Sequence, residues 1–94
     1  MAHASDTALA GLRELLRQLR AVPGLTEKRP GTYYWKSQAF IHFHEEPSEG
    51  GVRLSADIKK VPGSGFDRLP VDTPEQQRRL LDEARKRARK LEDD

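Results

Sequence analysis

The sequence predicts a two-layer α+β fold, in which an N-terminal helix and a C-terminal helix pack on one face of a three- to four-stranded antiparallel sheet. Apolar residues recur every three or four positions near each end of the chain, as expected of helices with one buried face. Between them, residues 52–59 alternate almost strictly between apolar and polar side chains, as expected of a strand with one buried face. The second face of such a sheet is left open to solvent, a ligand or a partner.

Length and composition narrow the class of protein. The chain has 94 residues, which suits one α+β domain over 1–94, with disordered tails expected at 1–5 and 93–94. It has no cysteine, so disulfides, thiolate catalysis and cysteine-based metal sites are excluded. No apolar run approaches the roughly 20 residues that span a bilayer. The amino terminus lacks the basic start and apolar centre of a signal peptide, which indicates a cytoplasmic protein with no membrane contact.

Two helices are expected. The first should begin at Ser5 or Asp6 and end near Val22, before Pro23-Gly24. The last should begin after Thr73, with a proline at its first position and a capping-box glutamine at Gln76. Its basic residues are expected to be neutralised by acids four positions away, which argues against nucleic acid as a partner. The expected pairs are Arg78–Asp82, Arg79–Glu83, Asp82–Lys86 and Glu83–Arg87.

The sheet is expected between these helices. Residues 32–35 form a short aromatic strand that turns through a three-residue loop into a strand over 39–44. Residues 45–51 are expected to be a loop, followed by the alternating strand 52–59. Residues 66–71 form a short edge strand, because Pro70 is tolerated only at an edge. Residues 25–31 are expected to be a polar connection.

The strand 39–44 is the main candidate for function. Side chains alternate between the two faces of a strand. This places His42, His44 and Phe40 on the open face, opposite the core-facing Ala39, Ile41 and Phe43. Matching the core faces of strands 39–44 and 52–59 sets either His44 or His42 opposite Arg53. In both registers Asp57 is at best diagonal to His42.

Three interpretations of the two histidines follow. In the first, the open face binds a small anion through His42, His44, Arg53 and Ser55, with Tyr34 and Trp35 at its border. In the second, His42 and His44 bind a metal ion with Asp57 as the third ligand, although the nearby Arg53 is a poor neighbour for a cation. In the third, the imidazoles face only water, a protein partner or a second copy in a homodimer.

Catalysis has little support in the sequence. It contains no nucleophile beside an orienting base and no glycine-rich phosphate loop. The favoured function is a non-enzymatic binding or interaction module that requires no cofactor and takes an anion or a partner on the open sheet face. Metal binding and nucleic-acid binding are the two alternatives.

Two short runs resemble known bacterial families. The run Leu19–Glu27, with Val22-Pro23-Gly24-Leu25, and the hairpin Trp35–Phe40 resemble the MmcQ/YjbR family of small bacterial proteins. In that family a Leu-Pro-Gly-Val-x-Glu helix end precedes a strand–turn–strand that carries a phenylalanine. Residues 39–44, followed by Ala56-Asp57-Ile58, are also similar to a short bacterial domain labelled luciferase-like, which has its own His-x-His strand.

The resemblance covers roughly residues 12–60. It implies a bacterial-type protein with a helix–antiparallel sheet–helix fold, and for the first family a nucleic-acid-binding role. It implies no catalytic residues, and this chain is shorter than typical members of either family.

Overall fold

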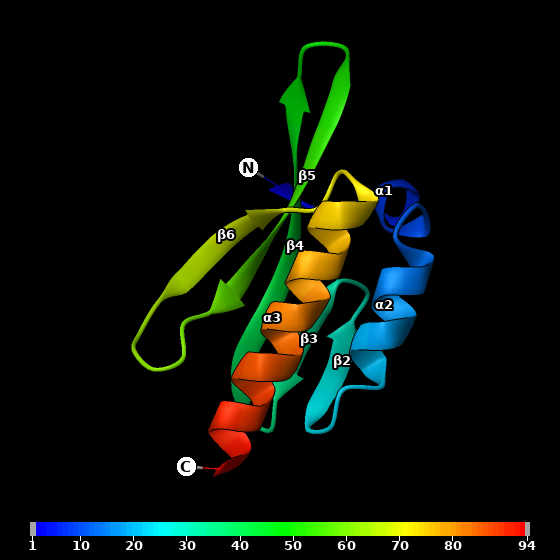
Figure 1. Cartoon of the computed structure of the whole chain (residues 1–94). Helices are drawn as coiled ribbons and strands as arrows, with labels where there is room; N and C mark the ends of the chain where they lie inside the picture. Colours follow the sequence, from blue (N-terminus) through cyan, green and yellow to red (C-terminus); the bar gives the residue numbers. More distant parts are fainter. Residues whose placement is uncertain (1, 94) are drawn as a thin grey trace.

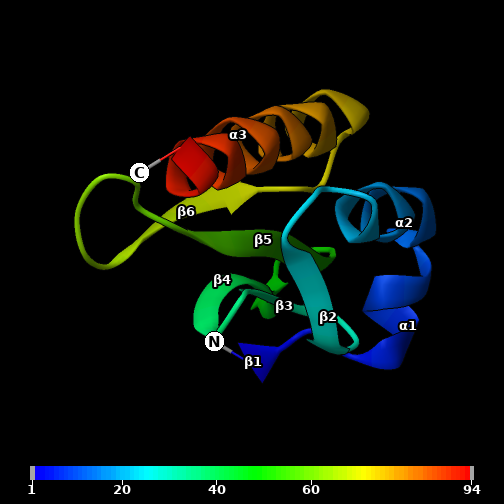
Figure 2. The same ribbon diagram turned by 90° about the horizontal axis from the view of Figure 1, so that it is seen from below.

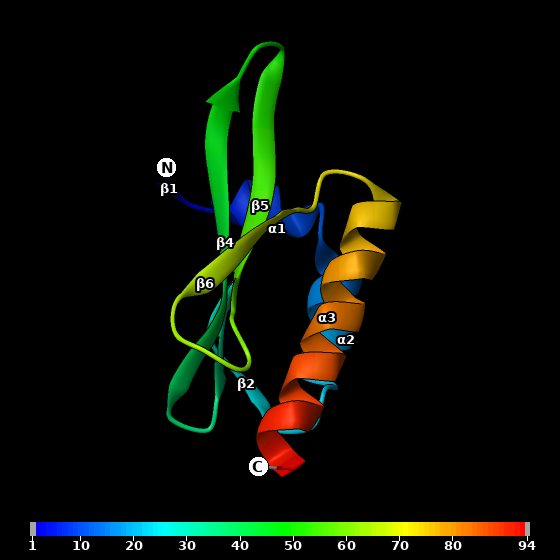
Figure 3. The same ribbon diagram turned by 60° about the vertical axis from the view of Figure 1, so that its left-hand side comes forward.

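The computed structural model describes residues 2–93 and has the two layers that the sequence predicts. Helices α2 (Arg13–Arg20) and α3 (Pro74–Asp93) lie beside each other over one face of the sheet, and no helix of the described residues covers the other face (Figures 2 and 3). A short helix, α1 (Asp6–Ala10), precedes α2. The α+β class and the placement of the helices on one face are therefore confirmed (Figure 1).

Six antiparallel strands form the sheet within residues 2–93, more than the three or four expected. Their order is β2-β3-β4-β5-β6, and β1 pairs with the central strand β4. The bounds are β1 Ala2–His3, β2 Leu25–Arg29, β3 Thr32–Trp35, β4 Gln38–Ser48, β5 Gly51–Lys59 and β6 Phe66–Pro70.

The chain ends are more ordered than expected. Instead of belonging to a disordered tail, Ala2 and His3 pair with Glu45 and His44 of β4. At the other end, α3 continues through Asp93. Residues 1 and 94 lie outside the described part of the chain.

The core lies between the helices and the sheet. Burial of apolar side chains in this layer is the main stabilising contribution to the fold. The largest fully buried side chains come from both layers: Tyr33, Phe40, Phe43, Leu19, Ile41, Ile58, Leu80 and Val71. The Tyr33 hydroxyl also donates a hydrogen bond of 3.0 Å to the Leu16 carbonyl, which links β3 to α2.

The first helix is broken, whereas the sequence predicted one helix to Val22. Ser5 caps α1 as expected, with its hydroxyl accepting from Ala8 N at 3.2 Å. The chain turns at Gly11, and Leu12 N donates to the Leu9 carbonyl before α2 begins. Glycine is a poor helix former, so the helix is easily interrupted at this position. The break still leaves Leu9, Leu12 and Leu15 buried.

β2 occupies most of the segment that was expected to be a polar connection. It pairs along β3, and its only buried side chain is Leu25. The turn before it requires glycine, because Gly24 has φ +89° and a Cβ atom there would clash with Trp35 Nε1. Trp35 therefore packs into the core beside this turn, where it is 6% exposed.

A bulge in β4 changes which face Phe40 occupies. Tyr33 pairs with Ile41 and Tyr34 with Ala39, so Phe40 is an extra residue between them. Such a residue interrupts the alternation of side chains. Phe40 is fully buried, which corrects its assignment to the histidine face. Ala39, which was expected to face the core, lies opposite Tyr34 on the open face. The turn before β4 contains two residues, Lys36 and Ser37, and not three.

β4 and β5 are longer than predicted and form a projecting hairpin. Residues 45–51 are mostly strand, and the turn is reduced to Glu49 and Gly50, since Ser48 pairs with Gly51. Gly50 adopts φ +85°, a conformation that glycine permits. The pairing of β1 ends at Glu45 and that of β6 at Ser55, so residues 46–53 extend beyond the other strands as a two-stranded arm (Figure 1).

The start of α3 agrees with the prediction. Thr73 Oγ1 accepts from Gln76 N at 3.1 Å, and Gln76 Oε1 accepts from Thr73 N at 3.0 Å. Together the two bonds form a capping box. β6 likewise lies at an edge of the sheet, which leaves room for Pro70.

Candidate functional site

The open face of the sheet carries a straight row of polar side chains. Directly opposed residues on neighbouring strands are Arg29, Thr32, His42, Asp57 and Arg68, from β2 to β6. Opposed residues share one face of a sheet, so this row crosses the open face from edge to edge.

A second row runs beside the first. It contains His3, His44, Ser55 and Pro70, again directly opposed on successive strands. The two rows bring five polar side chains together, which we call the open-face cluster: His42, His44, Ser55, Asp57 and Arg68.

The observed register corrects the one expected from the sequence. His42 lies opposite Asp57 and His44 opposite Ser55, whereas Arg53 lies opposite Glu46. The tight turn at Glu49-Gly50 causes this difference, because the predicted loop was longer. The shared face of the two histidines, Ser55 and Asp57 was predicted correctly. However, Asp57 is an immediate neighbour of both histidines and Arg53 is displaced toward the arm.

Asp57 is the acceptor at the centre of the cluster. Its Oδ2 atom lies 3.0 Å from His44 Nε2, and its Oδ1 accepts from Arg68 Nε at 2.9 Å. Burial alone would raise the pKa of Asp57, but the hydrogen bonds from Arg68 and His44 and their positive charge outweigh it. The pKa of Asp57 is therefore lowered, and its carboxylate is charged at neutral pH.

His42 is held in its neutral form. Burial lowers the pKa of His42, and the neighbouring His44 lowers it further, against the opposing effect of Asp57. Its ring centroid lies 5.8 Å from that of Phe66 and 6.3 Å from that of His44. Phe66 is itself 44% exposed and borders the cluster on β6.

Two polar atoms of the cluster are buried without a partner. His42 Nε2 and Ser55 Oγ form no hydrogen bond with any atom of residues 2–93. A buried polar atom without a partner costs about 1–3 kcal/mol, so such atoms are uncommon and often mark functional positions. These two belong to residues that are diagonal neighbours on β4 and β5.

Three residues of the predicted anion site lie apart from the cluster. Arg53 Nε donates to Ser48 Oγ at 3.2 Å, which directs the side chain toward the tip of the arm. Trp35 is in the core, because it lies two residues after Tyr33 on β3 and so faces the same side, where it packs beside the Gly24 turn. Tyr34 is on the open face opposite Ala39, with Lys28 Nζ 5.8 Å from its ring centroid.

The metal interpretation gains no support from the geometry. Within residues 2–93, no three His, Asp or Glu side chains are placed so that they could hold a metal ion. His44 and Asp57 instead bond to each other, and Arg68 contacts the same carboxylate. A guanidinium at this distance opposes the binding of a cation.

Arg68 and Phe66 were missed by the sequence reasoning. Both lie on β6, which was predicted as an edge strand without a register against β5. The available signal was the opposite charge of Asp57 and Arg68, since such residues favour positions opposite each other on neighbouring strands. The register of β6 against β5 could not be predicted from the sequence, because the length of the glycine-rich turn between them does not fix where pairing starts.

No family model, curated protein or solved structure matches this chain. The resemblance to the MmcQ/YjbR and luciferase-like families therefore stays a prediction. Among the described helices, none has both the length and the apolar character needed to cross a membrane.

Proposed function

We propose that this protein is a non-enzymatic binding module that takes a small anion, a phosphate or a carboxylate, at the open-face cluster. The observation that carries the proposal is the pair of buried, unpartnered atoms, His42 Nε2 and Ser55 Oγ. An anionic oxygen accepts a hydrogen bond from a hydroxyl and from a protonated imidazole. A bound anion would therefore be a hydrogen-bond partner for both atoms.

Arg68 supplies the permanent positive charge. A guanidinium has five N–H donors, and two of its nitrogens contact Asp57. The Arg68 side chain is 51% exposed, which leaves its remaining donors accessible from solvent. An anion between Arg68 and His42 would also favour protonation of His42.

The arrangement fits binding better than acyl-transfer catalysis. A serine nucleophile requires a hydrogen bond to a base, as in a Ser-His-Asp triad. Ser55 is opposite His44, but its hydroxyl forms no hydrogen bond with the imidazole or with any other group of residues 2–93. We therefore assign Ser55 to ligand binding.

The test is an NMR titration with inorganic phosphate at constant ionic strength, observing the histidine ring resonances. Titrations at about pH 6 and about pH 8 lie on either side of the ordinary histidine pKa of about 6.5. We expect saturable shifts at His42 and His44, tighter binding at the lower pH, and a higher pKa of His42 when phosphate is bound.

Substitutions test whether phosphate binds at the open-face cluster or responds only to the overall charge of the surface. Arg68→Gln and His42→Gln should each weaken phosphate binding at least about tenfold, a loss of about 1.4 kcal/mol. Arg13→Gln removes an exposed charge from α2 and should leave the affinity unchanged. Equal weakening by all three variants, or shifts that never saturate, would exclude the site.

The open face could instead bind a second copy of the chain. Phe66 at its border is a large apolar side chain that is 44% exposed. Sedimentation of the protein over a range of concentrations distinguishes this occupant. A dimer that persists in phosphate and dissociates on substitution of Phe66 would favour the homodimer over the anion.

A second candidate function is binding of nucleic acid by α3. Of the four ion pairs expected along this helix, only Glu83–Arg87 forms, at 3.0 Å. Six exposed basic residues of α3 have no ion pair within residues 2–93: Arg78, Arg79, Arg85, Lys86, Arg89 and Lys90. They lie along a helix face and could contact successive phosphates.

Fluorescence anisotropy with a short labelled duplex tests this second function. If about five phosphates are neutralised, the logarithm of the affinity should fall with the logarithm of salt concentration with a slope of about −4 to −5. Arg79→Gln with Lys86→Gln should reduce the slope. Absence of binding at low ionic strength would eliminate the nucleic-acid function.

A further inference from the structure

A groove lies between α2 and α3, on the layer opposite the open-face cluster. Its cavity near the end of α2 has a volume of about 320 Å³. A second cavity of about 390 Å³ continues it toward the start of α3. The two share Gln18 and Arg85, so they form one groove along the helix pair. A volume of this size falls within the range of small-molecule sites.

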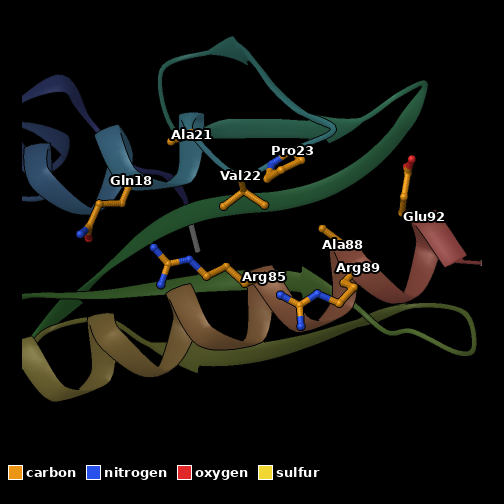
Figure 4. A pocket seen from close by; sticks show the side chains of 8 residues that line it. All are labelled: Gln18, Ala21, Val22, Pro23, Arg85, Ala88, Arg89 and Glu92. Carbon is orange, nitrogen blue, oxygen red and sulfur yellow. The ribbon is translucent and has the colours of Figure 1, made fainter.

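The first cavity is apolar along its length and basic at its edge. Val22 and Ala88 are buried and form its inner wall together with Pro23 (Figure 4). Arg85 and Arg89, one turn apart on α3, line the same cavity, and neither has an ion pair within residues 2–93. Such a combination suits a ligand with an apolar body and an anionic group.

The charges along the groove also indicate where an anionic group would bind. Glu92 lines the end near the C-terminus of α3, two helical turns from Arg85 (Figure 4). Two turns correspond to about 10.5 Å along the helix. Carboxylates also line the other end, because Glu14 and Asp82 lie beyond Arg85 in the second cavity. An anionic group is therefore expected between the two ends, at Arg85 and the adjacent Arg89, with the apolar body over Val22 and Ala88.

We propose that the α2–α3 groove binds a monocarboxylate with a medium-length alkyl chain, its carboxylate at Arg85 and its chain along Val22, Pro23 and Ala88. A chain of about eight carbons matches the distance between Arg85 and Glu92. The guanidinium of Arg85 can bind the carboxylate with two parallel hydrogen bonds. The site is independent of the open-face cluster, since it lies on the other side of the sheet.

Octanoate is the probe, and its binding is followed by amide resonances in a two-dimensional NMR spectrum of the full chain. We expect saturable shifts at Ala21, Val22, Ala88 and Arg89. Acetate tests the charge alone and octan-1-ol tests the chain alone, and both should bind at least about tenfold more weakly than octanoate. Octan-1-ol binding as tightly as octanoate would overturn the role of Arg85.

Two variants and two controls complete the experiment. Ala21→Phe should abolish the shifts by filling the groove, because Ala21 lines it, is exposed, and has a backbone that any L-residue can adopt. Arg85→Gln should weaken octanoate binding about tenfold. Arg79→Gln, on the side of α3 away from the groove, should bind as the unchanged protein does.

The second control tests whether octanoate binding in the groove is independent of the open-face cluster. His42→Gln should bind octanoate normally, because His42 is on the other face of the sheet. Loss of octanoate binding in His42→Gln, or unchanged binding in Ala21→Phe and Arg85→Gln, would overturn the groove proposal. Binding of an acidic peptide in the groove without any response to octanoate would also overturn it.

Discussion

Asp57 contacts side chains from two neighbouring strands at once. His44 on β4 and Arg68 on β6 both contact its carboxylate, so this side chain connects three strands on the open face. Only 21% of the Asp57 side chain is exposed, whereas Arg68 is half exposed. Solvent screening limits the strength of the Arg68 pair, so it stabilises the fold no more than an ordinary surface ion pair does.

The contacts of Asp57 predict how the free energy of unfolding depends on pH. The pKa of Asp57 is lowered by folding. Its contribution to the free energy of unfolding is therefore present above the unfolded-state pKa, near the ordinary aspartate value of 3.8, and is lost as pH falls through the folded-state pKa. Asp57→Asn should therefore be less stable by about 1 kcal/mol at neutral pH, and the difference should vanish at the lowest pH.

Urea unfolding from about pH 2 to pH 7 measures this difference. Glu49→Gln, at the turn of the arm, is a control that removes a carboxylate with no ion pair within residues 2–93. If Asp57→Asn and the unchanged protein lose stability in parallel below pH 4, the carboxylate is not stabilised as described.

Single residues also show where sequence reasoning reaches its limit. The period of two correctly placed His42, His44, Ser55 and Asp57 on one face. The same period could not predict which residues lie opposite them on the next strand, because the register depends on a turn two residues long at Glu49-Gly50. Phe40 was misplaced because a bulge adds one residue without any sign in the pattern of apolar side chains.

At the scale of elements, α3 begins with the best-defined capping structure in the described chain. Thr73 and Gln76 satisfy each other's backbone N–H groups, and Gln76 Oε1 also accepts from Asp72 N at 2.9 Å. The first N–H groups of a helix have no partner within the helix, so these side chains replace the missing acceptors. The helix buries Leu80, Leu81, Ala84 and Ala88.

Loss of this cap should destabilise the protein by a measurable amount. Thr73→Ala removes the acceptor for Gln76 N and should lower the free energy of unfolding by about 1 kcal/mol. Thermal and chemical denaturation both measure this loss of stability. Thr7→Ala, at an exposed position inside α1, should change stability by no more than a few tenths of a kcal/mol. Equal effects of the two substitutions would contradict the role of the cap.

Elements with strong local signals were predictable and those without were not. Thr73-Pro74 and Gln76 mark the start of α3 in the sequence itself. β2 has no comparable signal, because its sequence Leu-Thr-Glu-Lys-Arg is polar and only Leu25 is buried. It is a strand because β3 offers it an unpaired edge, and this is a tertiary effect that overrides local propensity.

For the whole molecule, the contact between the helical layer and the sheet determines stability. Apolar packing dominates this contact, and the Tyr33–Leu16 hydrogen bond is a buried polar link across it. Burial raises the pKa of Tyr33 well above its usual value, so the hydroxyl remains protonated and able to donate.

Tyr33→Phe should therefore lower the free energy of unfolding by about 1 kcal/mol, the usual contribution of a hydrogen bond. Tyr34→Phe is the matched control, because the neighbouring hydroxyl has no hydrogen bond within residues 2–93. Chemical denaturation of both variants measures the difference. A loss of stability in Tyr34→Phe as large as in Tyr33→Phe would show that the link between the layers is not the cause.

The arm formed by residues 46–53 should open more easily than the rest of the molecule. The molecule is 43 Å long and 23 Å across, and none of the helices in residues 2–93 packs on the arm (Figures 1 and 3). Its strands can separate without exposing the core, so its amide protons should exchange with deuterium through local fluctuations, while those of Ile41, Phe43 and Ile58 exchange only on global unfolding. The β4–β5 hairpin is thus one continuous element in the structure but two units in its dynamics, with the boundary next to the two histidines.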